Sequence, residues 1–429
     1  MVKFRFLAMS KNFDIEVTGN DEQEEKTNKY WILSPFASRG DAENDTATIP
    51  PYMQNTIELQ NKVKDLVSKL TNINPQINKL SDYFSKELKE NEWFYLSIDE
   101  DLSQENIYDI YVNLANIGAD KKTMELNQSS GEILKKISSQ YNLSLYNEFS
   151  RKAIGEPDKE KRICRYCQKS MPNVTFKNVA HTISEALGNK SIKTNDECDE
   201  CNKYFGDTIE QDFLSIFDFP RLFFNIKKKG GYPHKFVGDN YVIENEQNII
   251  KIRHTISDPQ KTQETIDDKK IMLSPKRQFP PQNIYKCLCK YVFGVLDDKT
   301  IKSFDRTRKW LIGETTENQL PKLARFYHPE VLNHPSIILY IRKDDANKEL
   351  PHVVAEIRII NMAFVVILPF SDKDSYIYDK EEDYNRFWDF FDIYSKIPKW
   401  EIVDCSGLDV TNPTIALHIV QKEINKNKQ

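Results

Sequence analysis

The sequence predicts an α+β protein of several domains, with a small metal-held unit between two larger parts. The chain has 429 residues, which is more than one ordinary hydrophobic core contains. Aromatic residues make up 11% of it, and these large side chains need a packed interior. Two Cys-x-x-Cys pairs stand near the middle, and such pairs are typical of a bound metal ion.

Residues 1–150 predict a mostly helical first domain. Alternating apolar side chains at Phe4 and Phe6, and again over residues 13–17, predict short strands at its start. Over residues 57–73 the apolar side chains mostly recur at steps of three and four, as one face of a helix requires. No catalytic motif occurs in this domain, so its role stays unassigned. Further helical patterns cover residues 106–118 and 131–149.

Residues 236–429 predict an α+β last domain. Residues 240–256 predict a β-hairpin, and the β-branched residues of 336–343 and 352–370 predict paired strands with a turn near Asn361. The expected role of this domain is regulation or target recognition. Helical patterns cover residues 283–296, 300–313 and 384–397.

The bulk properties argue against a membrane protein. The formal net charge of -5 also gives no overall basic field that would indicate nucleic-acid binding by the whole chain. The most apolar run, residues 362–370, is far shorter than the roughly 20 residues of a membrane helix. The first residues lack the uninterrupted apolar stretch of a signal peptide. We therefore expect a cytoplasmic protein without a membrane partner.

The central unit, residues 158–235, carries a predicted structural zinc site. Tight Cys-x-x-Cys loops let two thiolates converge on one tetrahedral ion, and two such loops complete a shell of four thiolates. Two matched pairs also argue against a redox-active pair. The predicted zinc ligands are Cys164, Cys167, Cys198 and Cys201.

The spacer between the two cysteine pairs is long enough for a two-stranded hairpin. Residues 168–197 exceed the roughly 15 to 20 residues that separate the pairs of a plain zinc ribbon. Alternation over residues 174–181 predicts a strand that ends at His181, and the second pair starts a helix with Asn202 in its first turn. Zinc would hold this helix against the hairpin, so His181 and Asn202 could lie close together.

This order of features resembles the HNH endonucleases, also called ββα-metal finger nucleases. The stretches "AHTISEALGN" and "ECDECNKYFG" are similar to the branch of that family that keeps both zinc knuckles. The resemblance is confined to the central unit. It implies metal-dependent hydrolysis of phosphodiester bonds, with DNA as the expected substrate and RNA as the alternative. By analogy with family members that have unfamiliar flanking domains, we expect a role in restriction or anti-phage defence, with a second copy or a defence protein as partner.

The resemblance also implies roles for individual residues. His181 would be the general base, because a neutral imidazole is well matched to accept a proton near pH 7. The amide oxygen of Asn202 stands where many family members have a metal-binding histidine, so it would bind a catalytic Mg2+ or Mn2+ ion. Asn195 is assigned as the middle asparagine that supports the loop bearing the base, with Asn189 as its rival.

Ala180 departs from the family pattern, because the residue before the base is typically an acid that helps to hold the metal. The candidates to replace that acid are, in order, Glu210, Asp199 and Glu185. Alternatively, Asn202 and the substrate hold the ion between them. The central unit, residues 158–235, is called the finger below. If it had lost its activity, it would be a zinc-stabilised module that binds nucleic acid or protein.

A local excess of basic residues predicts the nucleic-acid contact. Lys227, Lys228 and Lys229 stand beside a glycine pair and are predicted to contact phosphates. Residues 151–235 contain 16 basic and 12 acidic side chains, a formal charge of +4 within an acidic protein.

Overall fold

A computed structural model confirms the α+β fold class. The chain forms two compact units, Met1–Ser139 and Gln140–Gln429, and each is described by itself. Lys227, Lys228 and Lys229 lie outside the residues that the structure describes. The described residues are 2–19, 21–37, 48–70, 77–150, 153–226, 232–238, 241–246, 249–254, 266–267, 270–273, 277–328, 331–395, 399–411 and 415–418.

The N-terminal unit is built on a four-stranded antiparallel sheet in the order β2-β1-β4-β3. Phe4 and Phe6 are completely buried, as their alternation predicts. The predicted helices are therefore accompanied by a sheet that contains β3 and β4 in addition to the two strands expected at the start of the chain. The strands are β1 (Val2–Ala8), β2 (Phe13–Val17), β3 (Tyr52–Gln54) and β4 (Trp93–Ile98). The helices are α1 (Glu22–Leu33), α2 (Ile57–Leu70), α3 (Asn78–Asp82), α4 (Gln104–Asn116) and α5 (Lys121–Gln140).

Residues 141–146 form a strand, so the predicted helix over residues 131–149 is wrong beyond Gln140. This strand, β5 (Tyr141–Tyr146), pairs antiparallel with β14 (Ser336–Arg342). Tyr141 is fully buried, and its hydroxyl donates to the Pro351 carbonyl at 2.9 Å. Pairing with a strand far away in the sequence overrides the local helical pattern here.

The second unit contains a six-stranded antiparallel sheet in the order β17-β13-β16-β15-β14-β5. Its other strands are β13 (Leu323–Tyr327), β15 (Val353–Ile359), β16 (Met362–Ile367) and β17 (Glu401–Val403). β15 and β16 are buried along almost their whole length, as expected of strands covered on both faces. Ile360 and Asn361 form the turn between them, which confirms the predicted strand pair.

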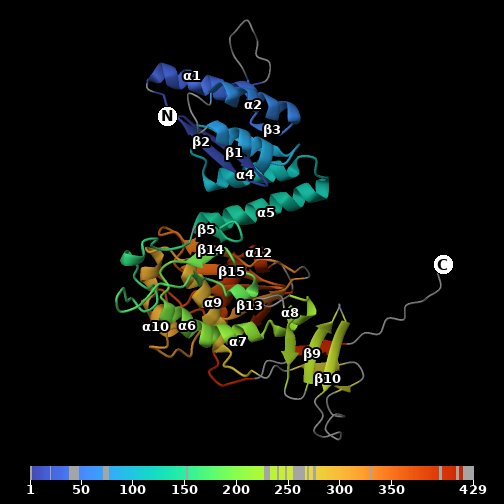
Figure 1. Ribbon diagram of the computed structural model, residues 1–429, viewed down its shortest axis with the longest axis vertical. Helices are drawn as coiled ribbons and strands as arrows, with labels where there is room; N and C mark the ends of the chain where they lie inside the picture. Colours follow the sequence, from blue (N-terminus) through green and yellow to red (C-terminus); the bar gives the residue numbers. More distant parts are fainter. Residues whose placement is uncertain are drawn as a thin grey trace, which may run out of the picture. The chain divides into compact units, whose positions relative to one another are not determined.

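One main hydrophobic core joins the central segment to the rest of the second unit. Figure 1 labels β5, β13, β14 and β15 of this unit. Helix α9 (Gln282–Val295) is buried on nearly all sides and carries Cys287 and Cys289 as buried thiols. Tyr166 belongs to the first Cys-x-x-Cys loop. The centroid of its ring lies 4.7 Å from the ring centroid of Phe205 and 5.4 Å from that of Phe293 in α9. Residues 158–235 and 236–429 therefore share this core, although the sequence analysis assigned them to different domains.

Smaller elements complete the second unit. The predicted β-hairpin is present as β9 (Tyr241–Glu246) and β10 (Ile249–His254), and β8 (Lys235–Val237) pairs with β9. A further three-stranded sheet contains β11 (Ile266–Asp267), β12 (Lys270–Leu273) and β18 (Ile415–His418). The remaining helices of the C-terminal part are α10 (Asp305–Leu311), α11 (Glu381–Phe390) and α12 (Asp392–Ser395). Within the described parts of the chain, no helix combines the length and the apolar character needed to span a membrane.

Candidate active site

The four predicted zinc ligands come together in the second unit. The Sγ atoms of Cys164, Cys167, Cys198 and Cys201 all lie within 4.8 Å of one another. The Sγ atoms of Cys167 and Cys198 are 3.7 Å apart. A tetrahedral ion with zinc–sulfur bonds of about 2.3 Å places neighbouring sulfur atoms about 3.8 Å apart. The four thiols therefore fit one structural metal ion such as zinc.

Backbone geometry holds these cysteines in place. The first knuckle closes through hydrogen bonds from the Gln168 amide to the Cys164 carbonyl and from the Cys164 amide to the Lys169 carbonyl, each 2.9 Å long. Cys198 is the N-cap of helix α6 (Asp199–Asp207), and its sulfur accepts from the Cys201 amide. Hydrogen bonds from the Cys198 and Cys201 thiols hold the pKa of Cys164 well below its ordinary value. The side-chain hydrogen bonds with Cys164 raise the pKa of Cys198 and Cys201, so a bound cation is needed to hold all four side chains as thiolates.

A buried ion pair that the sequence does not predict attaches the first knuckle to α9. Arg165 contacts Asp196 through two hydrogen bonds of 2.9 and 3.0 Å. The same guanidinium donates to the carbonyls of Phe293 and Gly294 near the end of α9. Arg165 and Asp196 stand near the cysteines in the sequence, but nothing in the local pattern indicates their partners on α9.

His181 ends a very short hairpin strand. β6 (Ala180–His181) pairs with β7 (Lys193–Thr194), so the strand predicted over residues 174–181 covers only its last two residues. The cause is Asp199, whose carboxylate accepts from the Lys177 and Asn178 amides at 2.9 Å each. These amides therefore bond to a side chain and not to a partner strand.

The same carboxylate fastens the chain before His181 to the first turn of α6. Asp199 also accepts from the Thr175 hydroxyl at 2.5 Å, and its own amide donates to the Thr175 carbonyl at 2.8 Å. Asn202 lies in α6, three residues beyond Asp199. The approach to His181 and the helix that carries Asn202 are thus directly linked. Both His181 and Asn202 are half-buried, so solvent reaches each of them.

Asn189, and not Asn195, closes the loop between the two hairpin strands. The Asn189 side chain is buried; its amide nitrogen donates to the carbonyls of Ile183 and Ile192 at 2.8 Å each. Its oxygen accepts from the amides of Ser191 and Ile192. The half-buried Asn195 side chain has one long hydrogen bond, 3.5 Å, to the Gly155 carbonyl. The geometry therefore favours the rival assignment.

We expect Asn189→Ala to lower the free energy of unfolding by about 2 to 4 kcal/mol, because it leaves several buried backbone groups without partners. Asn195→Ala removes one long hydrogen bond, so its expected cost is below about 0.5 kcal/mol. Chemical denaturation of the two variants measures both values. Equal losses would contradict the assignment of the loop support to Asn189.

Glu210, the first candidate for the missing metal oxygen, pairs with a lysine. Its Oε1 atom lies 3.0 Å from the Nζ atom of Lys290, which is completely buried in α9. Glu197 is also buried, with Oε1 3.5 Å from Nζ, and neither of its carboxylate oxygens has a hydrogen bond. Burial raises the pKa of Glu197 to about 7, although Lys290 opposes this shift. One ammonium therefore faces two acids, and Glu210 is engaged as its partner.

The other candidate acids offer little to a second ion. Asp199 is occupied by the segment before His181, and Glu185 is exposed in the hairpin loop. Ala180 itself is buried. In the described part of the chain, the four cysteines are the only group of three or more His, Cys, Asp or Glu side chains that could hold a metal ion. Mg2+ is commonly bound by few protein groups together with water and phosphate oxygens, so Asn202 remains compatible with such an ion.

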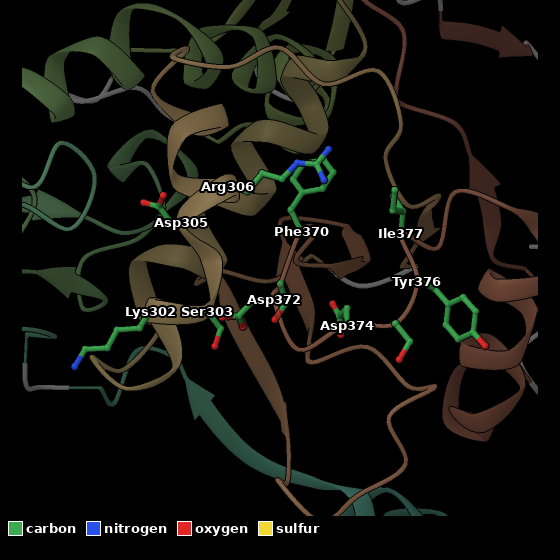
Figure 2. Close-up of a pocket in the computed structure, with 11 residues that line it drawn as sticks. Lys302, Ser303, Asp305, Arg306, Phe370, Asp372, Asp374, Tyr376 and Ile377 are labelled. Carbon is green, nitrogen blue, oxygen red and sulfur yellow. The ribbon is translucent and has the colours of Figure 1, made fainter.

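A separate pocket of about 400 Å³ lies outside this site (Figure 2). None of its lining residues belongs to the finger; they are Lys302, Ser303, Asp305, Arg306, Phe370, Ser371, Asp372, Asp374, Ser375, Tyr376 and Ile377. Arg306 packs against the ring of Phe370 and pairs with Glu317 at 2.7 Å. Asp374 accepts from the His352 amide at 2.6 Å. These polar groups already have partners within the protein, so the pocket adds no residue to the candidate site.

A comparison with known families finds one match in this region. Residues 164–218 match the family described as HNH endonuclease. The match begins at Cys164 and includes the hairpin, α6 and α7 (Ile209–Ser215), ending where α8 (Asp218–Phe223) begins. No curated protein and no solved structure matches the chain. Residues 164–218, which contain the four-cysteine cluster, are therefore similar to HNH endonucleases, and this similarity suggests a nuclease.

Proposed function

We propose that the protein is a metal-dependent endonuclease that hydrolyses phosphodiester bonds of DNA, with His181 as the general base and a divalent cation at Asn202. The observation that carries this proposal is the link through Asp199. It fastens the segment leading to His181 to the first turn of the helix that bears Asn202. A nuclease needs such a fixed relation, because small misplacements of reacting groups are costly.

Each residue then has a chemical role. The half-buried imidazole of His181 accepts the proton of the attacking water. A bound Mg2+ or Mn2+ ion stabilises the charge that develops on the phosphate. Asn202 contributes an amide oxygen to that ion, and the substrate contributes others, because Glu210 is paired with Lys290. Asn189 takes the role of the middle asparagine by closing the loop after His181.

DNA is the proposed substrate because of local charge. Residues 151–235 carry a formal charge of +4, and phosphate contacts dominate the affinity of proteins for nucleic acid. Lys227, Lys228 and Lys229 are proposed to make such contacts. A role in restriction or anti-phage defence, in the cytoplasm and with a second copy or a defence protein as partner, rests on family analogy alone.

A decayed nuclease is the second candidate function. It is favoured by Ala180 in place of an acid and by the ion pair that engages Glu210. Such a protein would bind nucleic acid or another protein through a zinc-stabilised scaffold. It would bind DNA without cleaving it in any divalent metal.

Purified protein is expected to nick or linearise plasmid DNA when Mg2+ or Mn2+ is added, because the proposed mechanism uses a divalent cation to stabilise the charge that develops on the phosphate. Agarose gels measure this conversion, with single-stranded and structured RNA as parallel substrates. Excess EDTA serves as the control and should stop cleavage. Binding of DNA without cleavage in either metal would support the decayed module instead, and cleavage of RNA alone would reassign the substrate.

A further inference from the structure

Lys290 contacts the finger from outside the segment that matches the nuclease family. It lies in α9, beyond residues 164–218, and its side chain is completely buried. Transferring an ammonium group from water into a protein interior is costly unless it is paired and hydrogen-bonded. The groups that pair with the buried Lys290 ammonium therefore indicate which parts of the protein it holds together.

The Lys290 ammonium has polar contacts with four oxygen atoms of the finger. Nζ lies 3.4 Å from each of the carbonyl oxygens of His181 and Thr182. It lies 3.0 Å from Oε1 of Glu210 and 3.5 Å from Oε1 of Glu197. An ammonium group has three donors and no acceptor, and the three hydrogen bonds go to the carbonyls of His181 and Thr182 and to Glu210, whereas Glu197 is held by charge alone. One side chain thus joins the strand of His181 to α7 and to the second zinc knuckle.

The backbone of the same residue is also tied to the finger. The Tyr166 hydroxyl donates to the Lys290 carbonyl at 3.2 Å, and Tyr166 belongs to the first zinc knuckle. Both knuckles and the strand of His181 therefore contact the same residue of α9, Lys290. An apolar side chain of similar length could fill this space, but it could not donate to the carbonyls of His181 and Thr182.

We propose that Lys290 is a positioning residue that sets the orientation of His181 by binding the backbone carbonyls at and after it. This inference rests on the proposed function, because it assigns a role to Lys290 in the same site. Lys290 touches neither water nor phosphate in the reaction. It acts by fixing the backbone from which the imidazole projects, and a shift of that backbone moves the base away from the attacking water.

The test replaces the charge without leaving buried acids unpaired. Lys290→Met alone strands two carboxylates, so the variant is the triple Lys290→Met/Glu197→Gln/Glu210→Gln, compared with the double Glu197→Gln/Glu210→Gln. Lys286→Met is the matched control on the same helix, because the Lys286 ammonium lies over the ring of Trp310, 5.2 Å from its centroid, and Trp310 lies outside the finger.

Two readouts separate positioning from general stability. Relative to the double variant, the triple variant is expected to show a kcat about 10- to 100-fold lower with an unchanged KM. Its zinc content should remain one per chain. In protein with isotope-labelled histidine, the ring signals of His181, assigned by their absence in His181→Ala, should shift in the triple variant. Lys286→Met should change neither kcat nor these signals.

The ring signals test Lys290 even if the wild-type protein cleaves nothing, so the two proposals can fail separately. Absence of cleavage together with shifted His181 signals would reject the proposed nuclease function and keep the positioning role. Unchanged His181 signals in the triple variant would overturn the positioning role, whatever the wild-type activity. A kcat equal to that of the double variant in an active enzyme would overturn it as well.

Discussion

His181→Ala is expected to lower the rate of phosphodiester cleavage by about 100- to 10,000-fold, which is the usual contribution of a general base. The structure predicts that the loss is chemical and not a failure to fold. The imidazole is half-buried at the end of β6, and the contact with Lys290 is made by the backbone carbonyl, which alanine retains. The rate of plasmid nicking measures the loss, and zinc content and the melting temperature should remain near those of the wild type.

The matched control for this variant is His328→Ala. His328 is also half-buried, but it follows β13 outside the finger. Its removal should leave the nicking rate within about twofold of the wild type, since a residue away from the reacting groups supplies no transition-state stabilisation. Cleavage at the wild-type rate by His181→Ala would contradict the proposed mechanism.

Cys198→Ser is expected to abolish zinc binding and to unfold the finger. Cys198 is both a predicted metal ligand and the N-cap of α6, so its loss would affect the zinc site and the helix that carries Asn202. Zinc sites of this kind contribute on the order of 10 kcal/mol to folding. Because the finger shares its core with α9 and the six-stranded sheet, we expect the melting temperature of the second unit to fall by at least about 10 °C. Metal analysis and calorimetry measure these effects.

Cys405→Ser provides the control for the loss of a buried thiol. Cys405 is buried in the second unit, and it is not part of the four-cysteine group. This variant should retain one zinc ion per chain even if it is somewhat less stable. Full zinc content and a normal melting curve in Cys198→Ser would refute the structural role of the metal.

The features of the site that depend on short-range patterns could be predicted from the sequence. The spacing of the cysteines indicates their convergence, the alternation before His181 indicates a strand end, and the pattern after Cys201 indicates the helix with Asn202. The two Cys-x-x-Cys loops, the strand end and the start of the helix are each set by residues within a few positions of one another, and the two matched loops predict a shared ion. The family match over residues 164–218 covers the same local features.

The features that depend on distant residues could not be predicted. The partner of Glu210 is Lys290, eighty positions away, and a lysine within an apolar helix pattern gives no sign of which acid it meets. The strand at residues 141–146 forms because β14 supplies its hydrogen bonds, whereas the local pattern favours a helix. Asn189 and Asn195 are the same type of residue, and only the fold shows that Asn189 is the one hydrogen-bonded to surrounding backbone amides and carbonyls.

Strand β5 also determines where the chain can be divided. It is the edge strand of the six-stranded sheet, and it lies before the residue at which a boundary drawn from the nuclease motif would fall. A fragment that began at residue 151 would uncover the backbone of β14, leaving a row of unpaired amides and carbonyls as a template for aggregation. A fragment that carries the residues matching the HNH family can therefore be transferred to another protein with its sheet intact only if it includes residues 141–146.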